Sequence, residues 1–456
     1  MKDSIWLAMR KLLFSVAAIV LVFDACQKET KSKTIVNNIQ LKAVPSTPKA
    51  EHLSAQVAVD WYKLQLRIIL NANPAISPTV AGRIFAYTGI GLYESVRYGI
   101  KNSVSFSKKL YQMPAMPSRE NNNGYNWEVS ANTALASLVR SFYPGLTDQN
   151  KASIDSLEKA YNEMLLADLD LTAFQRSQSY GHAVAEAIFN WSKTDNDNQS
   201  STGYVIPVFA GAWEKTPPAF VNPASPFLGE ARPLLQLHVT GVGPVFPFPY
   251  SEIPSSDFYK MVKDIYNVSQ TMTPEQRDIA LFWNDIGVGR GYTPPGHSVS
   301  ILNQLLEQKQ ISLGLAAEGY AKLGIALREA LILCFRSKYH YNLVRPVTYI
   351  RKLINPIWLP LIGTPAHPEY PAAHAYVTMA AMEALSKLFG DNVAFIDHTY
   401  DFLGFAPRTF SKLTDAGKES GISRRYGGIH YLPSIETGWA LGMKIGDDIG
   451  GIKLTE

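Results

Sequence analysis

The chain has 456 residues, of which 46% are hydrophobic and 18% are charged. This composition supports a large buried core and excludes a disordered or fibrous chain. The net charge of +4 is too small for this length to indicate a nucleic-acid-binding surface. With only two cysteines, Cys26 and Cys334, a disulfide framework and a cysteine metal site are also excluded.

Residues 1–26 have the pattern of an export signal. Basic residues precede an apolar run from Leu12 to Phe23, which at about a dozen residues is too short to span a bilayer. The following sequence FDAC resembles a bacterial lipoprotein signal in which Cys26 becomes the acylated first residue. An ordinary signal peptide and an uncleaved anchor are the alternatives. We expect an exported protein that is lipid-anchored to the outer or cell membrane, or otherwise periplasmic or secreted.

Residues 27–50 are polar and lack a sustained period, which predicts a flexible tether. From residue 51 onward, apolar residues recur at three- and four-residue intervals, and alternating strand patterns are nearly absent. We therefore predict a single all-α domain over residues 51–456. The expected helices cover 53–70, 77–99, 127–142, 147–165, 171–193, 254–268, 273–285, 297–309, 313–336, 371–389 and 433 to the end.

Residues 202–250 form a different kind of segment. They are dense in proline, glycine and aromatic residues, which excludes a long helix. A connection of this length inside a compact domain often has a functional role. This segment is either a packed connector or part of the entrance to a site.

The segment KYHYNLVRP, residues 338–346, contains two cations that we expect to act together. Lys338 and Arg345 are separated by nearly two helical turns, so both would project from almost the same helix face. Pro346 would end or kink this helix, because the residue before a proline avoids the α region. Alone, a pair with this spacing is usually part of a solvated helix face.

The segment that starts at Pro371 predicts a helix with His374 in its first turn. A helix start leaves backbone N–H groups unpaired and carries a partial positive charge, so it favours an anion. The helix dipole also favours a neutral imidazole, which suits acid–base exchange. A capping or core histidine is the plainer interpretation of His374 by itself.

Arg424 and His430 are six residues apart, so an unbroken helix would direct them to different sides. Gly427 and Gly428 would interrupt the helix and let the two side chains converge. All three segments therefore provide cations and histidines for one small oxyanion.

Together, the three segments resemble the three-part signature of the type 2 phosphatidic acid phosphatase and vanadium haloperoxidase superfamily. The residues that carry the resemblance are Lys338, Arg345, Pro346, Pro371, His374, Ser423, Arg424 and His430. The resemblance extends over most of residues 52–450, and residues 213–233 are similar to a stretch of secreted bacterial haloperoxidase-like proteins. It implies a helical bundle with the oxyanion site within residues 338–438.

The resemblance also implies a role for each site residue. His430 would bond vanadium directly, or attack phosphorus in a phosphatase, and His374 would be the acid–base residue on the opposite side. Guanidinium groups present the forked donors that oxyanions accept. The residues that would hold vanadate or phosphate are Lys338, Arg345, Ala373, Arg424 and His430.

Three residues depart from the family pattern. Ala372 lacks a serine hydroxyl that would bond the oxyanion, a contact typically worth about 1.5–3 kcal/mol. Ala373 adds a methyl group where the family has glycine. Ser434 replaces the acid that orients the phosphatase nucleophile, which argues more against a phosphatase than against a haloperoxidase. A weakened or inactive site is therefore an open alternative.

Two further residues are secondary candidates. His367 lies seven residues before His374, where the resemblance implies a histidine in bromide-using haloperoxidases and an aromatic residue in chloride-using ones. A surface histidine is the plainer interpretation. Asp285, in the segment FWNDIG, is a candidate support for His374.

We therefore expect a vanadate-dependent enzyme that oxidises bromide or iodide with hydrogen peroxide to a hypohalous acid. His374 would handle the proton, and Lys338 would polarise the peroxide. The first alternative is a phosphatase that hydrolyses phosphomonoesters or lipid phosphates through phosphorylated His430. The second is a non-catalytic, lipid-anchored protein that binds an oxyanion or a partner. A zinc hydrolase is disfavoured because the sequence has no HExxH motif.

Overall fold

The computed structural model describes residues 49–456, except for residues 122, 144 and 286–290. The predicted signal with Cys26 and almost all of the predicted tether lie outside the described residues. The described residues belong to one compact unit, Pro45–Glu456. Ala50 is fully buried within it. The folded part therefore begins before the predicted boundary at residue 51.

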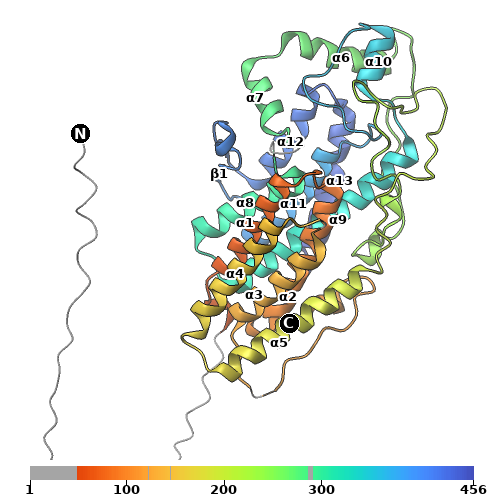
Figure 1. Ribbon diagram of the computed structural model, residues 1–456. Coiled ribbons are helices and arrows are strands. Elements are labelled where there is room, and N and C mark those ends of the chain that lie inside the picture. The colour runs from red at the N-terminus through yellow and green to blue at the C-terminus, as the bar shows by residue number, and fades with distance from the viewer. Residues whose placement is uncertain (1–48, 122, 144, 286–290) are drawn as a thin grey trace, which may run out of the picture. The chain divides into compact units, whose positions relative to one another are not determined.

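The prediction of an all-α fold is confirmed. Among the described residues, the only named strands are β1 (Phe395–Asp397) and β2 (Arg408–Phe410), which form one antiparallel pair. Figure 1 shows the helices in chain order. They are α1 (Gln56–Asn71), α2 (Pro78–Val96), α3 (Trp127–Phe142), α4 (Asp148–Leu166), α5 (Leu171–Ser192), α6 (Asp257–Thr271), α7 (Pro274–Phe282), α8 (Thr293–Lys309), α9 (Leu313–Tyr341), α10 (Pro346–Leu353), α11 (Ala373–Phe389), α12 (Leu413–Tyr426) and α13 (Leu432–Gly450). No helix in these ranges is both long and apolar enough to cross a bilayer.

The helices α2 and α9 form the most extensive helix pair of the core (Figure 1). Their backbones approach closely at two glycines. A Cβ atom at Gly89 would lie 2.5 Å from the carbonyl oxygen of Tyr320, and one at Gly324 would lie 2.3 Å from that of Phe85. No Cβ atom fits at these distances, so the close packing of α2 on α9 requires glycine at both positions.

Helix α11 packs against α9, α12 and α13. The packing on α13 is again close, because a Cβ atom at Gly442 would lie 2.4 Å from the carbonyl oxygen of Tyr376. The end of α9, the start of α11 and the link between α12 and α13 carry the three segments that the sequence singles out. Packing around α11 therefore brings these segments to one region of the domain.

The expectation that Lys338 and Arg345 share one helix face is wrong. Helix α9 ends at Tyr341, where Asn342 adopts the left-handed conformation with φ of 47° and ψ of 42°. Arg345 has extended backbone, with φ of −81° and ψ of 152°, because it precedes Pro346. Pro346 then begins α10, a short helix that the sequence does not predict. A change of chain direction, and not a shared helix face, brings the two cations together.

The segment between α5 and α6, residues 193–256, contains no α-helix and only two short 3₁₀ turns, Leu228–Glu230 and Gln236–His238. The absence of a long helix from residues 202–250 is thus confirmed. This connector is fastened to the site segments by backbone hydrogen bonds. The N–H of Ala224 donates to the carbonyl of Ala366 at 2.7 Å, and the N–H of Trp213 donates to that of Asn342 at 2.6 Å. The connector therefore forms part of the wall around the site.

Candidate oxyanion site

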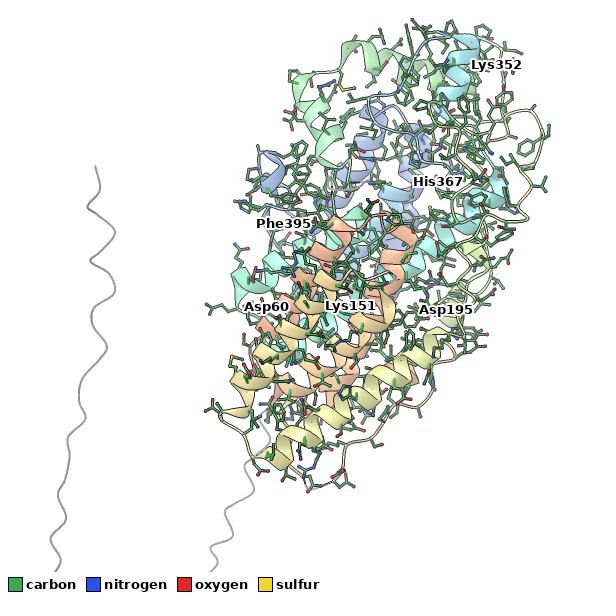
Figure 2. The ribbon with its side chains drawn as sticks, in the orientation of Figure 1. Asp60, Lys151, Asp195, Lys352, His367 and Phe395 are labelled. Atoms are coloured by element: carbon green, nitrogen blue, oxygen red, sulfur yellow. The ribbon has the colours of Figure 1, made fainter. Side chains whose placement is uncertain are left out.

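A cavity of about 240 Å³ lies at the N-terminal end of α11. Three histidines from separate segments line it: His367 from the loop before α11, His374 from the first turn of α11, and His430 from the link between α12 and α13. Figure 2 labels His367 among the C-terminal segments. The rest of the wall comes from the starts of α2 and α8, from α9 and from the connector. The structure thus brings the predicted histidines to one cavity.

Lys338 and Arg345 lie next to this cavity and are completely buried. The ammonium group of Lys338 donates to the carbonyls of Pro368 and Glu369, each at 2.9 Å. The guanidinium group of Arg345 donates to the carbonyls of His367 and Ile429, also at 2.9 Å. These bonds hold both cations against the loop before α11, and they also hold Arg345 against the link between α12 and α13.

Arg424 is the third completely buried cation. Its Nε donates to the hydroxyl of Ser423 at 2.9 Å, and its Nη2 donates to the carbonyl of Trp283 at 2.6 Å. The remaining nitrogen, Nη1, is buried and has no hydrogen-bond partner among the described residues. A buried donor of a charged group without a partner is costly, so Nη1 indicates a place for an acceptor.

None of these three cations forms an ion pair within 4.0 Å in the described part of the chain. Burial lowers the pKa of Lys338 to about 7 and the pKa values of Arg345 and Arg424 to about 10. Burying unpaired cations disfavours their charged forms, and a bound anion would reverse that cost. The donors, their burial and the free Nη1 atom therefore fit a multiply charged oxyanion such as vanadate or phosphate.

Glu369 orients His430, and the sequence did not predict this contact. Its Oε1 atom accepts from Nδ1 of His430 at 2.8 Å and from the N–H of Tyr431 at 2.9 Å. On the other side of the ring, Nη1 of Arg345 lies 3.1 Å from Nε2 of His430. Arginine only donates, so Nε2 is the acceptor and Nδ1 carries the proton. The nitrogen expected to face the oxyanion is thus held unprotonated.

This contact corrects the interpretation of Ser434. The sequence indicated that no acid orients the histidine, because Ser434 occupies the expected position. The structure shows Glu369 in that role, from a segment 61 residues earlier in the chain. Burial raises the pKa of Glu369 to about 7. The lost acid is therefore replaced, and the sequence argument against phosphatase chemistry loses its force.

His374 is supported by Asp285, as the sequence suggested. Its Nε2 atom lies 3.0 Å from Oδ1 of Asp285, and burial together with the charge of Arg424 lowers the pKa of His374 to about 4. Nε2 faces a carboxylate that only accepts, so Nε2 carries the proton and Nδ1 has a free lone pair. His374 is thus a neutral group that can accept a proton.

The support continues beyond Asp285 into the core. Nδ1 of His297 lies 3.4 Å from Oδ2 of Asp285, and Nε2 of His297 lies 2.7 Å from Oδ2 of Asp397. Burial opposes the charge on His297, but the two carboxylates raise its pKa to about 9. Burial alone would raise the pKa of Asp285, yet its two histidine partners hold it below the usual range. His297 therefore keeps Asp285 ionised as an acceptor for His374.

His367 is buried, with only 9% of its surface exposed, so the surface interpretation of this residue is wrong. Its Nδ1 atom lies 3.0 Å from Nη2 of Arg345 and 3.2 Å from the carbonyl of Pro368. Arg345 only donates, so Nδ1 accepts from it. Burial, followed by the charges of Lys338 and Arg345, lowers the pKa of His367 well below its usual value. The cavity therefore has a neutral imidazole in its wall.

The N-terminus of α11 faces the same region. Ala372 is the N-cap residue, and no side chain in the described part of the protein caps the helix with a hydrogen bond. Ala372 packs in a small cluster with Ala375 and Ile435, whereas Ala373 lines the cavity. A helix start without a side-chain cap leaves its first N–H groups for another acceptor. The alanine at position 372 thus adds to packing while leaving these donors to a ligand.

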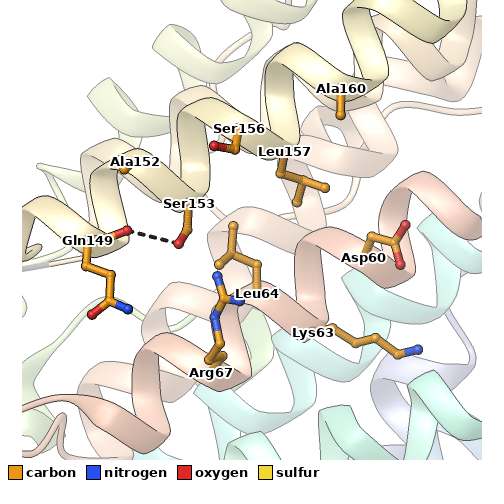
Figure 3. Close-up of a pocket in the computed structure, with 10 residues that line it drawn as sticks. All are labelled: Asp60, Lys63, Leu64, Arg67, Gln149, Ala152, Ser153, Ser156, Leu157 and Ala160. Atoms are coloured by element: carbon orange, nitrogen blue, oxygen red, sulfur yellow. Dashed lines mark hydrogen bonds between the residues drawn. The ribbon is translucent and has the colours of Figure 1, made fainter. Parts of the chain in front are cut away.

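A larger hollow of about 740 Å³ lies between α1 and α4. Figure 3 shows its lining, which includes Asp60, Lys63 and Arg67. No histidine lines it, and none of the predicted site residues contributes to it. Volume alone therefore does not identify the site.

We expect the affinity of the site for a tetrahedral dianion to fall as the pH rises above about 7. Lys338, with a pKa of about 7, loses its proton in this range, and Glu369, also near 7, gains a negative charge. Both changes weaken anion binding, by up to roughly ten-fold per pH unit for each group. Calorimetric titration with tungstate, from pH 6 to pH 9, measures this dependence. Lys338→Met should bind more weakly at pH 6 and show a shallower slope, and a pH-independent affinity of the unmodified protein would contradict the prediction.

Comparison with known proteins identifies relatives of this arrangement. Residues 355–451 match the family described as the VCPO second helical-bundle domain. The crystal structure of a bacterial vanadium-dependent iodoperoxidase is similar over 89% of this chain and 98% of that chain, with 30% sequence identity and a TM-score of 0.80. No curated protein matches the sequence.

Two structures of bacterial vanadium-dependent chloroperoxidases share the fold at lower identity. The apo-type structure covers 82% of this chain and 93% of its own, with 17% identity and a TM-score of 0.60. The holo-type structure covers 89% of this chain and 94% of its own, with 16% identity and a TM-score of 0.57. At such identities the likeness concerns the fold alone.

Proposed function

This chain belongs to the vanadium haloperoxidase family, and from this premise we propose that it oxidises iodide or bromide with hydrogen peroxide in the presence of bound vanadate. The chain is an enzyme of the haloperoxidase type. The observation that carries the proposal is the set of three buried cations without carboxylate partners, one of which, Arg345, lies 3.1 Å from the unprotonated Nε2 of His430. Three such cations balance the charge of a multiply charged oxyanion, and Nε2 of His430 provides one nitrogen that can bond it.

Each residue has a distinct part in this reaction. Lys338, Arg345 and Arg424 would bind the oxygens of vanadate, with the N-terminus of α11 at Ala373, and His430 would bond the vanadium. When bound, vanadate supplies a Lewis-acidic centre that activates peroxide toward a halide without a change in its oxidation state. His374 accepts and returns the proton, because its free Nδ1 lone pair and its bond to Asp285 suit that exchange.

Iodide is the favoured halide in this proposal. The solved relative with 30% identity is named an iodoperoxidase. The cavity presents the neutral imidazole of His367 and largely apolar side chains, such as Leu331 and Phe335. A large, weakly hydrated anion loses less hydration free energy in such surroundings than a small one does. Bromide is the second choice, because the resemblance implies a histidine at the position of His367 in bromide-using haloperoxidases.

The test is peroxide-dependent halide oxidation by purified protein, with and without vanadate. We expect triiodide formation from iodide that requires vanadate and is abolished by His430→Ala. The same preparations are assayed for hydrolysis of an aryl phosphate. Hydrolysis inhibited by vanadate, without halide oxidation, would instead identify a phosphatase, and neither activity would leave a non-catalytic protein that binds an oxyanion.

The phosphatase remains the second candidate because of one observation. Glu369 holds Nδ1 of His430 at 2.8 Å, which keeps Nε2 unprotonated, as a nucleophile must be. A carboxylate in this position orients the histidine and stabilises its positive charge after attack. The same contact serves a vanadium ligand equally well, so the two activities are separated by assay.

We further propose that the protein is exported and anchored through a lipid on Cys26. The basic start, the short apolar run and the sequence FDAC support this proposal. The only membrane contact of the enzyme would then be its lipid.

A further inference from the structure

A second cavity, of about 220 Å³, lies between the connector, α9, α11 and α13. No described residue lines both this cavity and the oxyanion site. On α9, Leu331 and Phe335 face the oxyanion site. Leu333 and Ser337, each two residues farther along, face the second cavity. Two residues turn a helix by about 200°, so the second cavity lies on the opposite face of α9. We call it the rear cavity.

Hydrogen bonds fix the connector side of the rear cavity. The hydroxyl of Tyr341 donates to the carbonyl of Gly243 at 2.6 Å, and Nη1 of Arg336 donates to the carbonyl of His238 at 3.0 Å. Nδ1 of His238 lies 2.6 Å from Oε2 of Glu329 on α9. The wall is therefore formed before any ligand binds, and a ligand does not have to order it.

Tyr376 gives the rear cavity a buried donor without a partner. This residue of α11 lines the cavity with only 3% of its surface exposed, and its hydroxyl forms no hydrogen bond within the described part of the chain. The hydroxyls of Tyr341 and Tyr370, in contrast, both donate to connector carbonyls at 2.6 Å. Burial raises the pKa of Tyr376, so its hydroxyl keeps the proton. A buried donor without a partner is costly, so this hydroxyl indicates a place for an acceptor.

The charges around the rear cavity favour an anion. Nε2 of His238 lies 3.3 Å from Oδ2 of Asp448, so His238 lies between the carboxylates of Glu329 and Asp448. Burial opposes the charge on His238, but these two carboxylates raise its pKa. Arg336, and Lys444 in the cavity lining, have no carboxylate within 4.0 Å among the described residues. Three cations thus face two carboxylates, and the excess of one positive charge fits a monoanion.

The rest of the lining is mainly apolar and limits the size of the ligand. Its larger side chains are Leu237, Val242, Leu333, Leu441 and Ile445. Such walls stabilise an apolar group by removing its surface from water. A cavity of about 150 Å³ is enough to bind benzene in another protein. At about 220 Å³, the rear cavity has room for one ring or a short branched chain with a small polar group.

We propose that the rear cavity is a second binding site of this protein, for a small monocarboxylate with a single ring or a short branched chain. The carboxylate accepts from the hydroxyl of Tyr376 and pairs with the ammonium group of Lys444. The apolar part of the ligand packs between Val242 of the connector and Ile445 of α13, so the ligand fastens the connector to the bundle. The ligand is not transformed, and the site does not depend on the haloperoxidase reaction.

Fluorine NMR of 4-fluorobenzoate with the full-length protein tests this binding. Saturating vanadate is present, so that the cations of the oxyanion site are occupied. We expect saturable binding with a dissociation constant in the millimolar range, which is usual for a ligand of this size. 4-Fluorobenzamide has the same size and no charge, and it should bind about ten-fold more weakly or less.

Two variants place the probe in the rear cavity. Tyr376→Phe removes only a hydroxyl that has no partner in the described chain, so the fold should persist, and Lys444→Met removes the cation. Each should weaken binding of 4-fluorobenzoate about ten-fold. Lys453→Met changes another exposed lysine, one that does not line the cavity, and is the matched control.

Three results would overturn the proposal: no saturable binding of 4-fluorobenzoate, binding of 4-fluorobenzamide as tight as that of the carboxylate, or the same affinity in Tyr376→Phe and Lys444→Met as in Lys453→Met. Circular dichroism of each variant confirms that it is folded. The assay involves no turnover, so a protein without haloperoxidase activity would still give each of these results.

Discussion

Replacement of His374 by alanine is expected to lower the kcat of iodide oxidation by about 10²–10⁴, the usual contribution of a positioned acid–base group. Burial and the charge of Arg424 lower the pKa of His374 to about 4, so the imidazole is neutral at ordinary working pH and its lone pair is available. Steady-state rates with saturating vanadate measure the loss. The dissociation constant of vanadate, measured by calorimetry, should change far less than kcat, because four other side chains would hold the oxyanion.

Asp285 provides the control for this prediction. In the unmodified protein, Nε2 of His374 donates to Asp285 at 3.0 Å. Asp285→Asn keeps the shape of this side chain but presents an amide in place of the carboxylate. If Asp285 acts through His374, the double variant His374→Ala with Asp285→Asn should be no slower than His374→Ala alone. If the double variant instead loses rate by the product of the two single losses, Asp285 has a role that does not depend on His374. In His374→Ala alone, His297 still lies 3.4 Å from Asp285, so the buried carboxylate keeps one partner.

The sequence predicted that His374 and His430 would converge because the order of the motifs and their local chemistry can be recognised from the sequence alone. The start of α10, the start of α11 and the end of α12 follow from Pro346, Pro371, Gly427 and Gly428. At Gly428 the backbone has φ of +79°, which the break after Arg424 requires. The geometry of these segments nevertheless differs from the prediction, because Arg345 lies next to the cavity on an extended segment and not on the face of α9.

The supporting residues were not predictable in the same way. Glu369 contacts His430 across 61 residues, and His297 meets Asp397 across 100 residues. Neither pair belongs to a short motif, and a lone His or Glu in an apolar stretch is equally typical of a core position. Only the packing of α8 and of the loop before α11 brings these groups to the site. Because such long-range contacts are not visible in short motifs, Ser434 suggested that the acid beside His430 is lost. In the fold, Glu369 takes that place.

The second large effect is expected at Glu369. In Glu369→Ala, Nδ1 of His430 and the N–H of Tyr431 both lose their buried acceptor, which typically costs about 1–3 kcal/mol for each group. The ring of His430 is then free to turn or to change its tautomer. Partners of this kind commonly contribute 10–100-fold to the affinity of a metal site. We therefore expect the dissociation constant of vanadate to rise by about 10–100-fold, measured by calorimetry at pH 6.

Glu369→Gln separates orientation from charge. The N–H of Tyr431 must still meet an acceptor, so the amide oxygen should take the place of Oε1 and continue to accept from Nδ1 of His430. The glutamine variant lacks only the negative charge of Glu369, which weakens anion binding above pH 7. It should therefore bind vanadate as tightly as the unmodified protein or more tightly. Nitrogen NMR of His430 should report a protonated Nδ1 in the glutamine variant and a mixture of tautomers in the alanine variant. An equal loss of vanadate affinity in both variants would show that the charge of Glu369 supports the site, and not its hydrogen bond to His430.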